Sequence, residues 1–278
     1  MPIDCLPLLE ILENKKVSHV AAMKIDIEGF EEKKVAHNRA VKEANGELFL
    51  VFDSDDRCVP QALERFWYYW NSIPEHNRHQ FSGICGLCMD ETGTIVGDRF
   101  PAEEYIDSDS LEIKYRYRIS GEKWGAMRTD VLRAFPFRED IPGLVPEGTV
   151  WDAIARRYKT RFFNEALRIY CQDAPGLIAR KGERVDAAKS APGTLYAKKF
   201  YLENNIAYLR YAHREFVMED VRLTRFWLHC PRHLRRHIGY WPESVMGKTL
   251  VVVGIPLGIG MFLVDQWRRH RHGLGATP

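Results

Sequence analysis

Several features that often identify a class of protein are scarce in this chain of 278 residues. The formal net charge is only +2, so overall charge gives no indication of a nucleic-acid partner. No internal repeats or low-complexity tracts are apparent, which argues against a repeat architecture. No secretory signal peptide is visible over residues 1–7. We therefore expect an ordinary globular domain in the cytoplasm.

Cysteine is also sparse, with six residues scattered along the chain. Cys85 and Cys88 form the only close pair. With no second pair and no histidines at ligand spacing, this pair is a weak zinc motif. Its apolar surroundings favour two buried thiols instead, and reduced cysteines agree with a cytosolic domain.

The most informative stretch is ELFLVFDSDD, residues 47–56. Its apolar run, Leu48 to Phe52, predicts a strand that is buried on both faces. Asp53, Asp55 and Asp56 follow where this strand ends. Crowded carboxylates are unfavourable without a cation beside them. At the carboxyl end of a strand in an α/β sheet, where ligands usually bind, a divalent cation carrying phosphates is the expected partner. The pattern predicts an enzyme.

Two chemistries use such an aspartate cluster. Nucleotide-sugar glycosyltransferases hold Mg²⁺ or Mn²⁺ on the donor diphosphate with Asp-x-Asp, whereas haloacid-dehalogenase-type phosphatases use the first Asp as a nucleophile and the second as an acid. The phosphatase motif, Asp-x-Asp-x-Thr/Val, usually opens its domain, but here Arg57 follows Asp56 and 52 residues precede Asp53. The alternative is a purely structural role, in which the aspartates form a turn after the strand and bind no metal.

The surrounding residues favour the glycosyltransferase. The segment KKVAHNRAVKEANG, residues 33–46, predicts a helix that stops at Asn45-Gly46. Together with the strand and DSDD, it closely resembles the middle of family 2 glycosyltransferases of GT-A fold. The resemblance covers about residues 33–175 and continues through four more blocks: FSGICGLCMD (81–90), IVGDRFP (95–101), GEKWGAMRTDVLRAFPF (121–137) and VPEGTVWDAIARRYKTRFFNEALRIY (145–170).

The resemblance implies roles for four acidic residues. Asp53 and Asp55 match the metal-binding Asp-x-Asp, with Asp56 adjoining it, and Asp53 also contacts the donor. The implied cofactor is Mg²⁺ or Mn²⁺. Glu147 matches the general base that takes the proton of the acceptor hydroxyl in an inverting displacement. The family more often has Glu-Asp where Pro146-Glu147 stands, and a carboxylate favoured by the helix dipole is the alternative for Glu147.

Five further residues are weaker candidates. Lys123, Trp124 and Trp151 are candidates for the acceptor or sugar site, and a buried tryptophan on a strand is the alternative for Trp124. His37 and Asn38 match a family position near the nucleotide, and an exposed helix face is their alternative.

The amino-terminal part departs from the family. A GT-A nucleotide-binding half normally opens with strand, helix and strand, but residues 1–52 offer one helix-like run, Leu6 to Leu12, and one strand-like run, Val20 to Ile27. Either the first βαβ unit is missing or the protein is genuinely shortened. Asp26 and Glu28 are candidate substitutes for ribose or base contacts. A non-catalytic remnant of the fold is therefore an alternative function.

We expect a mixed, mostly parallel GT-A-like α/β sheet over residues 1–175, and a loop and helical extension over 176–240. A long loop is predicted over 172–192 and a helix over 195–216. From Arg222 to Arg236, basic and aromatic residues interleave, which suits anionic headgroups.

The last part, residues 241–278, is predicted to associate with a membrane. Thr249 to Val264 carries no charge over 16 residues, about 24 Å as a helix against a hydrocarbon core of about 30 Å. Because Pro256 and nearby glycines favour bending, we expect a hairpin or tilted helix dipping into one leaflet, with a spanning helix and a buried core element as alternatives.

The predicted function is transfer of a sugar from a nucleotide-diphosphate sugar to a hydroxyl of a sugar or lipid-linked acceptor, in cell-envelope polysaccharide or glycolipid synthesis. The predicted location is the inner face of the cell membrane, with the membrane surface, but no nucleic acid, as a further partner. The alternatives are the non-catalytic remnant and a phosphatase that uses Asp53.

Overall fold

A computed structural model of the chain describes most of it, with only the backbone for residues 20–25, 30–33 and 53. The described residues are 20–25, 30–53, 56–170, 187–188 and 190–271. The chain divides into two compact units: Met1–Phe137 with Val150–Lys181, and Arg138–Thr149 with Gly182–Pro278. The runs Leu6 to Leu12 and Asp26 to Glu28 lie outside the described residues.

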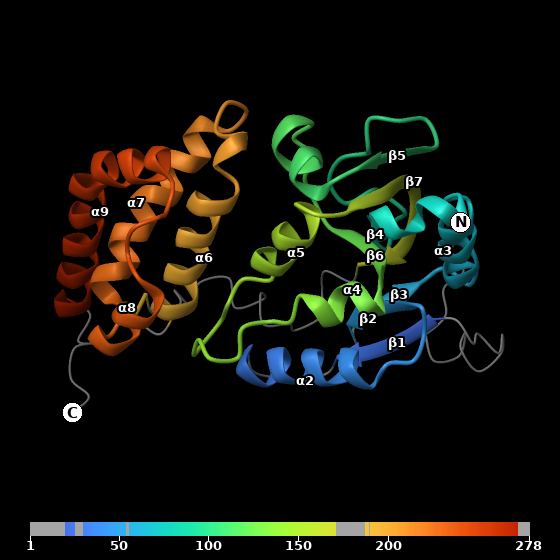
Figure 1. The fold of residues 1–278 in the computed structure, drawn as a ribbon, viewed down its shortest axis with the longest axis horizontal. Helices are drawn as coiled ribbons and strands as arrows, with labels where there is room; N and C mark the ends of the chain where they lie inside the picture. Colours follow the sequence, from blue (N-terminus) through green and yellow to red (C-terminus); the bar gives the residue numbers. More distant parts are fainter. Residues whose placement is uncertain (1–19, 26–29, 54–55, 171–186, 189, 272–278) are drawn as a thin grey trace. The chain divides into compact units, whose positions relative to one another are not determined.

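The first unit is an α/β structure (Figure 1). Its strands are β1 (Val20–Ile25), β2 (Leu48–Asp53), β3 (Arg57–Cys58), β4 (Phe81–Met89), β5 (Tyr105–Ser108), β6 (Lys123–Arg128) and β7 (Lys159–Ile169). Its helices are α2 (Phe30–Glu43), α3 (Ala62–Asn71), α4 (Thr129–Ala134) and α5 (Gly148–Ala155), of which α5 belongs to this unit from Val150 onward, with short helical turns at Glu75–Gln80 and Glu112–Arg116.

The described strands form one mixed sheet in the order β1-β2-β6-β4-β7-β3, with β5 also paired to β7. The parallel pairs are β1 with β2 and β4 with β7, and the other pairs are antiparallel. Following these pairings, β1, β2, β4 and β7 all run in one direction. The prediction of a mixed α/β sheet is confirmed, but the expectation of mostly parallel pairing is wrong because β6, β3 and β5 each run against their neighbours.

The predicted strand over the apolar run is confirmed as β2, and it is buried on both faces. Leu48, Leu50 and Phe52 pack in one hydrophobic cluster with side chains of α3. Phe49, between them, packs in a second cluster with residues of α2, α4 and α5. Since successive side chains point to opposite faces of a strand, an unbroken apolar run requires a cover on each face. The acidic run therefore follows a strand that is packed on both faces.

The second unit is helical. It contains α6 (Ala191–Asn204), a short turn at Ile206–Tyr208, α7 (His213–His229), α8 (Arg232–Ile238) and α9 (Val245–Arg271). An ion pair between Lys198 and Glu219 joins α6 to α7. Most of the predicted loop over 172–192 lies outside the described residues, but its end differs, since α6 begins at Ala191.

Two expectations for the helices of this unit are wrong. The helix expected over 195–216 is interrupted between α6 and α7. The hairpin considered for the carboxyl-terminal apolar segment is wrong, since α9 continues as one helix through Pro256 over 27 residues. Packing explains the second result. A carboxylate of α7 lies directly against Gly254, and Thr224 lies against Gly258, so these glycines permit close contact between two helices rather than a turn.

Candidate functional site

The acidic run lies at the edge of the sheet where the like-directed strands end. Asp53 is the last residue of β2, and Met89 and Ile169 end β4 and β7. The amide of Tyr170 donates to the Met89 carbonyl at 2.8 Å, which ties the ends of those two strands together. The carboxyl ends of such strands are the usual ligand-binding edge of an α/β sheet. The side chain of Asp53, and all of Asp55, lie outside the described residues.

Asp56 is buried and forms an ion pair with Arg168 of β7. The side chains of Asp56 and Arg168 are 2% and 10% exposed. A buried carboxylate is tolerated when a charge partner meets it. The structure therefore commits this carboxylate to a protein cation, which is a different environment from the metal-binding role that the sequence predicted for it.

The chain that follows the acidic run is fixed on β7 as well. Cys58 pairs with Arg168 in the sheet, and the Val59 amide donates to the Leu167 carbonyl at 3.0 Å. In the strand order, β2 and β3 are four positions apart. Four spacings in a flat sheet span about 19 Å, whereas the four residue steps from Asp53 to Arg57 reach at most about 14 Å. The sheet must therefore curl, which brings its carboxyl edge together around the acidic run.

Lys123 begins β6 and, because β6 runs against β2, it lies at this same edge. Its ammonium donates to the Ser120 carbonyl at 2.7 Å. Burial lowers the pKa of Lys123, and the charge of Asp98 opposes that shift. Asp98 in turn accepts hydrogen bonds from the Ser120 amide and hydroxyl, at 2.9 and 2.7 Å. The predicted contact of Lys123 with a sugar or phosphate remains a prediction.

Trp124 is a core residue. Its ring is 3% exposed and packs against Phe52 and Phe66, and its indole N–H donates to the Val51 carbonyl at 2.8 Å. The expectation that Trp124 stacks on a sugar is wrong, because the ring faces the interior and its polar atom is already hydrogen-bonded. The alternative of a buried tryptophan on a strand is confirmed.

His37, Asn38 and Trp151 also serve the packing of the first unit. The His37 ring is 7% exposed and makes edge contacts with Phe137 and Trp151. The Asn38 side chain donates to the Phe137 carbonyl and accepts from the Phe137 amide, both at 2.9 Å. The exposed helix face considered for His37 is therefore wrong. Half-buried Trp151 packs against Phe137 as well. These contacts give the three residues structural roles.

Glu147 is exposed and stands immediately before α5, in a segment that belongs to the second unit. Both the Thr149 amide and hydroxyl donate to the Pro146 carbonyl, at 3.1 and 2.9 Å, which fixes the turn around Glu147. The amino end of a helix favours negative charge. The predicted role of Glu147 as a base stays a prediction.

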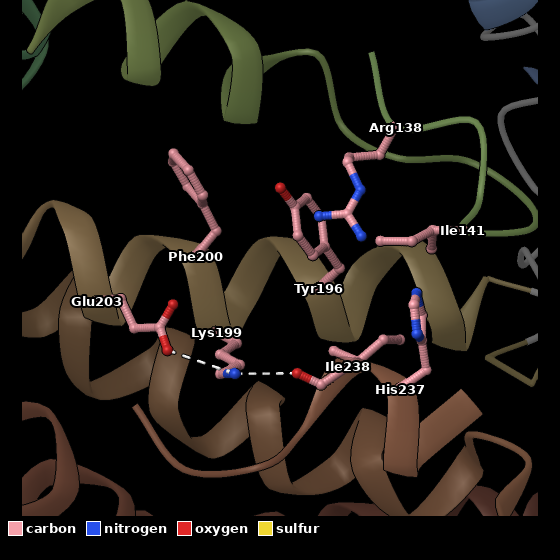
Figure 2. Close-up of a pocket in the computed structure, with 8 residues that line it drawn as sticks. All are labelled: Arg138, Ile141, Tyr196, Lys199, Phe200, Glu203, His237 and Ile238. Carbon is pink, nitrogen blue, oxygen red and sulfur yellow. Dashed lines mark hydrogen bonds and ion pairs between the residues drawn. The ribbon is translucent and has the colours of Figure 1, made fainter. Parts of the chain in front are cut away.

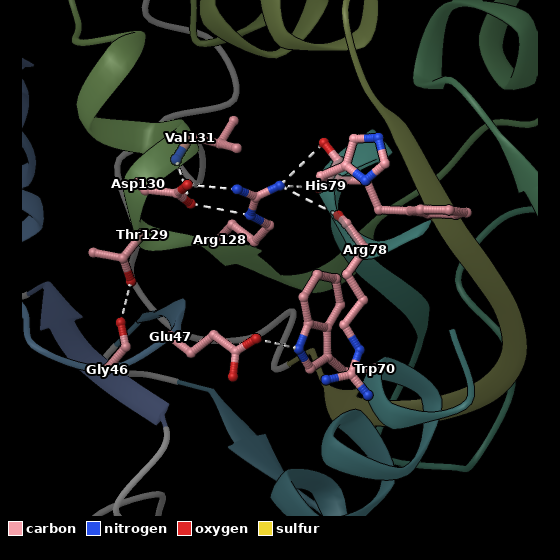
Figure 3. A network of polar contacts seen from close by, with 10 residues as sticks. Gly46, Glu47, Trp70, Arg78, His79, Arg128, Thr129, Asp130 and Val131 are labelled. Carbon is pink, nitrogen blue, oxygen red and sulfur yellow. Dashed lines mark hydrogen bonds and ion pairs between the residues drawn. The ribbon is translucent and has the colours of Figure 1, made fainter. Parts of the chain in front are cut away.

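The opposite edge of the sheet carries a hollow of about 640 Å³ that the sequence did not indicate. Figure 3 shows a network of polar contacts at this edge. There the Glu47 carboxylate accepts from the Trp70 indole at 2.7 Å, and Arg128 bridges Asp130 and the carbonyl of His79. Two further arginines cap helix ends: Arg78 bonds Asn71 at the end of α3. Arg133 bonds the carbonyl of Val41, in the last turn of α2, and that of Ala44, which follows the helix. This network holds helices on the sheet.

The second unit contains a smaller hollow of about 270 Å³ (Figure 2). Its charges are paired within the unit. Arg138 makes two bonds to Asp140, both at 2.6 Å, and His237 bonds the same carboxylate at 2.8 Å. Lys199 donates to the Ile238 carbonyl at 2.9 Å. Paired charges of both signs give this hollow no clear preference for a ligand.

Cys85 and Cys88 do not form a metal site. Cys88 packs in the cluster on one face of the sheet, with Leu50, and Cys85 packs against the cluster on the other face, with Leu87 and Phe162. Burial raises the pKa of each thiol to about 12. The two thiols are therefore protonated and face different clusters. Across the described part of the chain, no group of three or more His, Cys, Asp or Glu side chains is arranged to hold a metal ion.

Sequence reasoning missed Arg168, although the signal was present. Arg168 stands between Leu167 and Ile169 in a strand of buried apolar residues. An arginine in such a position needs an opposite charge. The three aspartates after β2 were the obvious source, but sequence alone does not say which strand faces the acidic run.

Comparisons with known proteins give limited help. No protein-family model matches the chain, and no curated protein matches it. Among solved structures, it is similar to S. aureus TarS 1-349 in complex with UDP-GlcNAc, with 14% identity and a TM-score of 0.49 over 95% of this chain and 79% of that one. The same protein in complex with UDP gives 14% identity and a TM-score of 0.47 over 96% and 79%. A further structure of S. aureus TarS gives 14% identity and a TM-score of 0.46 over 81% of this chain and 41% of that one. Similarity at this level assigns no function to the chain.

Proposed function

We propose that the chain is an inverting, metal-dependent glycosyltransferase of family 2 type, with a GT-A-like catalytic unit. The observation that carries the proposal is the position of the acidic run, at the end of a strand buried on both faces and at the edge where β1, β2, β4 and β7 all end. The blocks of sequence that resemble family 2 glycosyltransferases, over about residues 33–175, support it.

The residues of the run suit a hard divalent cation. Carboxylate oxygens are the ligands that Mg²⁺ and Mn²⁺ prefer, and we assign Asp53 and Asp55 as those ligands. A bound cation of this kind supplies charge neutralisation for a diphosphate leaving group. With Asp56 paired to Arg168, two of the three carboxylates remain to balance the double charge of one cation. Lys123, at the same edge, adds a positive charge for the donor or acceptor.

Glu147 is assigned as the general base. Its carboxylate takes the proton from the acceptor hydroxyl while that oxygen bonds to the anomeric carbon of the donor. The carbon–oxygen bond to the diphosphate breaks on the opposite face of the sugar, so the configuration inverts. The donor is a nucleotide-diphosphate sugar, and the acceptor is a hydroxyl of a sugar or a lipid-linked sugar, in synthesis of the cell envelope.

The chain is proposed to work at the inner face of the cell membrane. Within the described residues, α9 is long and apolar enough to cross a membrane, by length and composition, and little of it is buried against the rest of the chain. The membrane surface is therefore a proposed partner, and a lipid-linked acceptor at that surface fits it.

The test is turnover of a panel of nucleotide-diphosphate sugars by the full chain with Mn²⁺. Release of the nucleoside diphosphate is expected to stop with a chelator and in Asp55→Ala. Glu147→Gln is expected to slow turnover by about 10²–10⁴-fold, the usual contribution of a general base. Asp130→Asn is the matched control, because Asp130 is exposed and bonds Arg128 at the other edge of the sheet.

Each alternative to this proposal is identified by its own measurement. Activity that survives both chelation and Asp55→Ala rules out the proposed metal site. A phosphoryl group trapped on Asp53 establishes a phosphatase. Titration calorimetry that detects no binding of any nucleoside diphosphate with Mn²⁺ identifies a non-catalytic remnant of the fold.

A further inference from the structure

Helix α9 has two faces of different character. Gly247, Val251, Gly254 and Gly258 are buried and recur at the spacing of one helical stripe. Large apolar side chains on the rest of the helix are 41–80% exposed: Val245, Met246, Val252, Val253, Leu257, Ile259, Leu263, Val264 and Trp267. At 100° per residue, most of these lie opposite the buried stripe. A continuous apolar surface of this kind marks an interaction site.

Helix α7 lies beside α9 (Figure 1) and meets two glycines of the buried stripe. Asp220 lies against Gly254, and Thr224 lies against Gly258. Further along, the guanidinium of Arg225 makes two bonds to Asp265, at 2.6 and 2.9 Å. Three successive contacts therefore run in the same order along both helices, so α7 and α9 are parallel neighbours.

The contact with α7 decides how α9 can meet lipid. Fully apolar surroundings would have to receive α7 as well, with Asp220, Arg225 and His229, at a large cost for ionisable groups. His229 bonds Asp265 at 3.0 Å, and its ring packs on Phe262. Because α7 occupies one side of α9, only the opposite side is available to acyl chains. At 27 residues, about 40 Å, α9 is long enough to span a bilayer, but its partner prevents it.

The ends of the apolar face favour a lipid surface over a protein partner. No charged residue interrupts the chain from Thr249 to Val264. Lys248 stands before that stretch, and Trp267 with Arg268 and Arg271 stands after it, with each of these side chains exposed. Tryptophan next to basic residues is typical of the boundary between acyl chains and anionic headgroups. A protein interface would be expected to offer hydrogen-bonding groups within the apolar face.

We propose that α9 is an in-plane membrane anchor: it lies along the surface of an anionic bilayer, inserts the face opposite α7 into one leaflet, and does not cross. This deepens the membrane location proposed above and does not depend on whether the chain transfers sugars. It keeps the insertion into one leaflet that the sequence predicted, with a continuous helix in place of the hairpin. The amino and carboxyl ends of α9 then stay on the same side of the membrane.

The first test is binding of the full chain to vesicles in a flotation assay. Wild type is expected to float with vesicles that contain phosphatidylglycerol and to bind pure phosphatidylcholine weakly. Leu257→Asp, at a position that is 63% exposed, is expected to weaken binding at least about tenfold, because a leucine leaves the acyl region and a charge enters it. Val35→Asp on α2, 48% exposed, is the matched control and is expected to bind like wild type.

The second test decides between lying in the plane and crossing. A biotin placed after Pro278 is expected to remain fully accessible to streptavidin added outside intact vesicles. Protection of that biotin would show a spanning helix and overturn the proposal. Absence of vesicle binding by a folded wild-type chain would overturn it as well. A self-associated chain that becomes monomeric in Leu257→Asp, without vesicle binding, would assign the face to a second copy instead.

Discussion

At the scale of single residues, the pairing of Asp56 with Arg168 separates the three aspartates into two kinds. The side chain of Asp56 is nearly inaccessible and meets a guanidinium. Asp53 and Asp55 stand before it in the run. A carboxylate that already neutralises a buried arginine gives up that pair if it turns to a metal, and a buried charge without a partner is strongly unfavourable. We therefore expect Asp56 to hold the run on β7 and not to bind the cation.

The paired variant Asp56→Asn/Arg168→Met tests this division. Removing both charges together leaves neither unpaired, so Mn²⁺ affinity is expected to stay within about threefold of wild type, whereas Asp55→Asn loses at least about tenfold. Arg168→Met alone is expected to destabilise the chain by about 3–5 kcal/mol in urea unfolding.

Arg65→Met is the control for the single variant. It breaks a pair with Glu165 on the same strand, but those side chains are 31% and 35% exposed, so its cost is expected to be about 1 kcal/mol or less. If the paired variant lost Mn²⁺ as completely as Asp55→Asn, Asp56 would be a ligand.

At the scale of elements, α9 is one continuous helix in which two glycines are contact positions. Pro256 is exposed and its ring faces away from α7, while Gly254 and Gly258 face it. A side chain at Gly254 would overlap the carboxylate of Asp220. Gly260 stands in the same helix with open space around the position of a Cβ atom. A comparison of Gly254 with Gly260 therefore separates the effect of close packing from the effect of helix propensity.

Gly254→Ala is expected to destabilise the second unit by about 1–3 kcal/mol, as overpacking does. Gly260→Ala is expected to be neutral or to stabilise by up to about 1 kcal/mol, because alanine is the better helix former. Thermal unfolding followed by circular dichroism measures both. Equal effects at the two positions would show that α7 does not pack closely on α9 in solution.

At the scale of the whole molecule, the stability of the chain carries a dependence on pH from a buried acid. Asp220 is 1% exposed, and burial raises its pKa from 3.8 to about 7, against a smaller opposing effect of the Gly254 backbone. Tyr240, bonded to Thr224 at 2.6 Å, is a titratable neighbour. Burial also raises the pKa of Glu203 and lowers that of His229, so several groups of the second unit contribute.

The direction of this pH dependence follows from the linkage between proton binding and folding. Between about pH 4 and pH 7 the folded chain keeps a proton on Asp220 that the unfolded chain has lost, so stability falls as pH rises through that range and levels off above it. Asp220→Asn is expected to remove this part of the slope and to be more stable than wild type at pH 8 by a few kcal/mol. Urea unfolding at pH 5 and pH 8 measures the difference, and the other groups cancel in the comparison. A variant no more stable than wild type at pH 8 would place Asp220 in a solvated or paired environment.

The local pattern of the sequence was enough for the parts of the fold that depend on short-range order. The apolar run that became β2, the helix α2 before it and the acidic run after it were all predicted from periodicity and from neighbouring residues. Those signals act over a few residues, and burial on two faces requires an unbroken apolar run wherever the strand lies in the sheet. The burial of both close cysteines in separate clusters follows the same logic, because positions three apart on a strand face opposite ways.

Only the tertiary structure decided what each polar or aromatic side chain meets. Arg168 contacts a carboxylate 112 positions earlier in the chain, and Trp124 bonds a carbonyl 73 positions away. The direction of β6 and the close packing of α9 on α7 also depend on neighbours remote in sequence. A spacing or a composition fixes which residues share a face, but the partner across that face comes from chain topology. In this protein, the tertiary structure pairs Asp56 with Arg168. Asp53 and Asp55 are the carboxylates proposed to bind the cation.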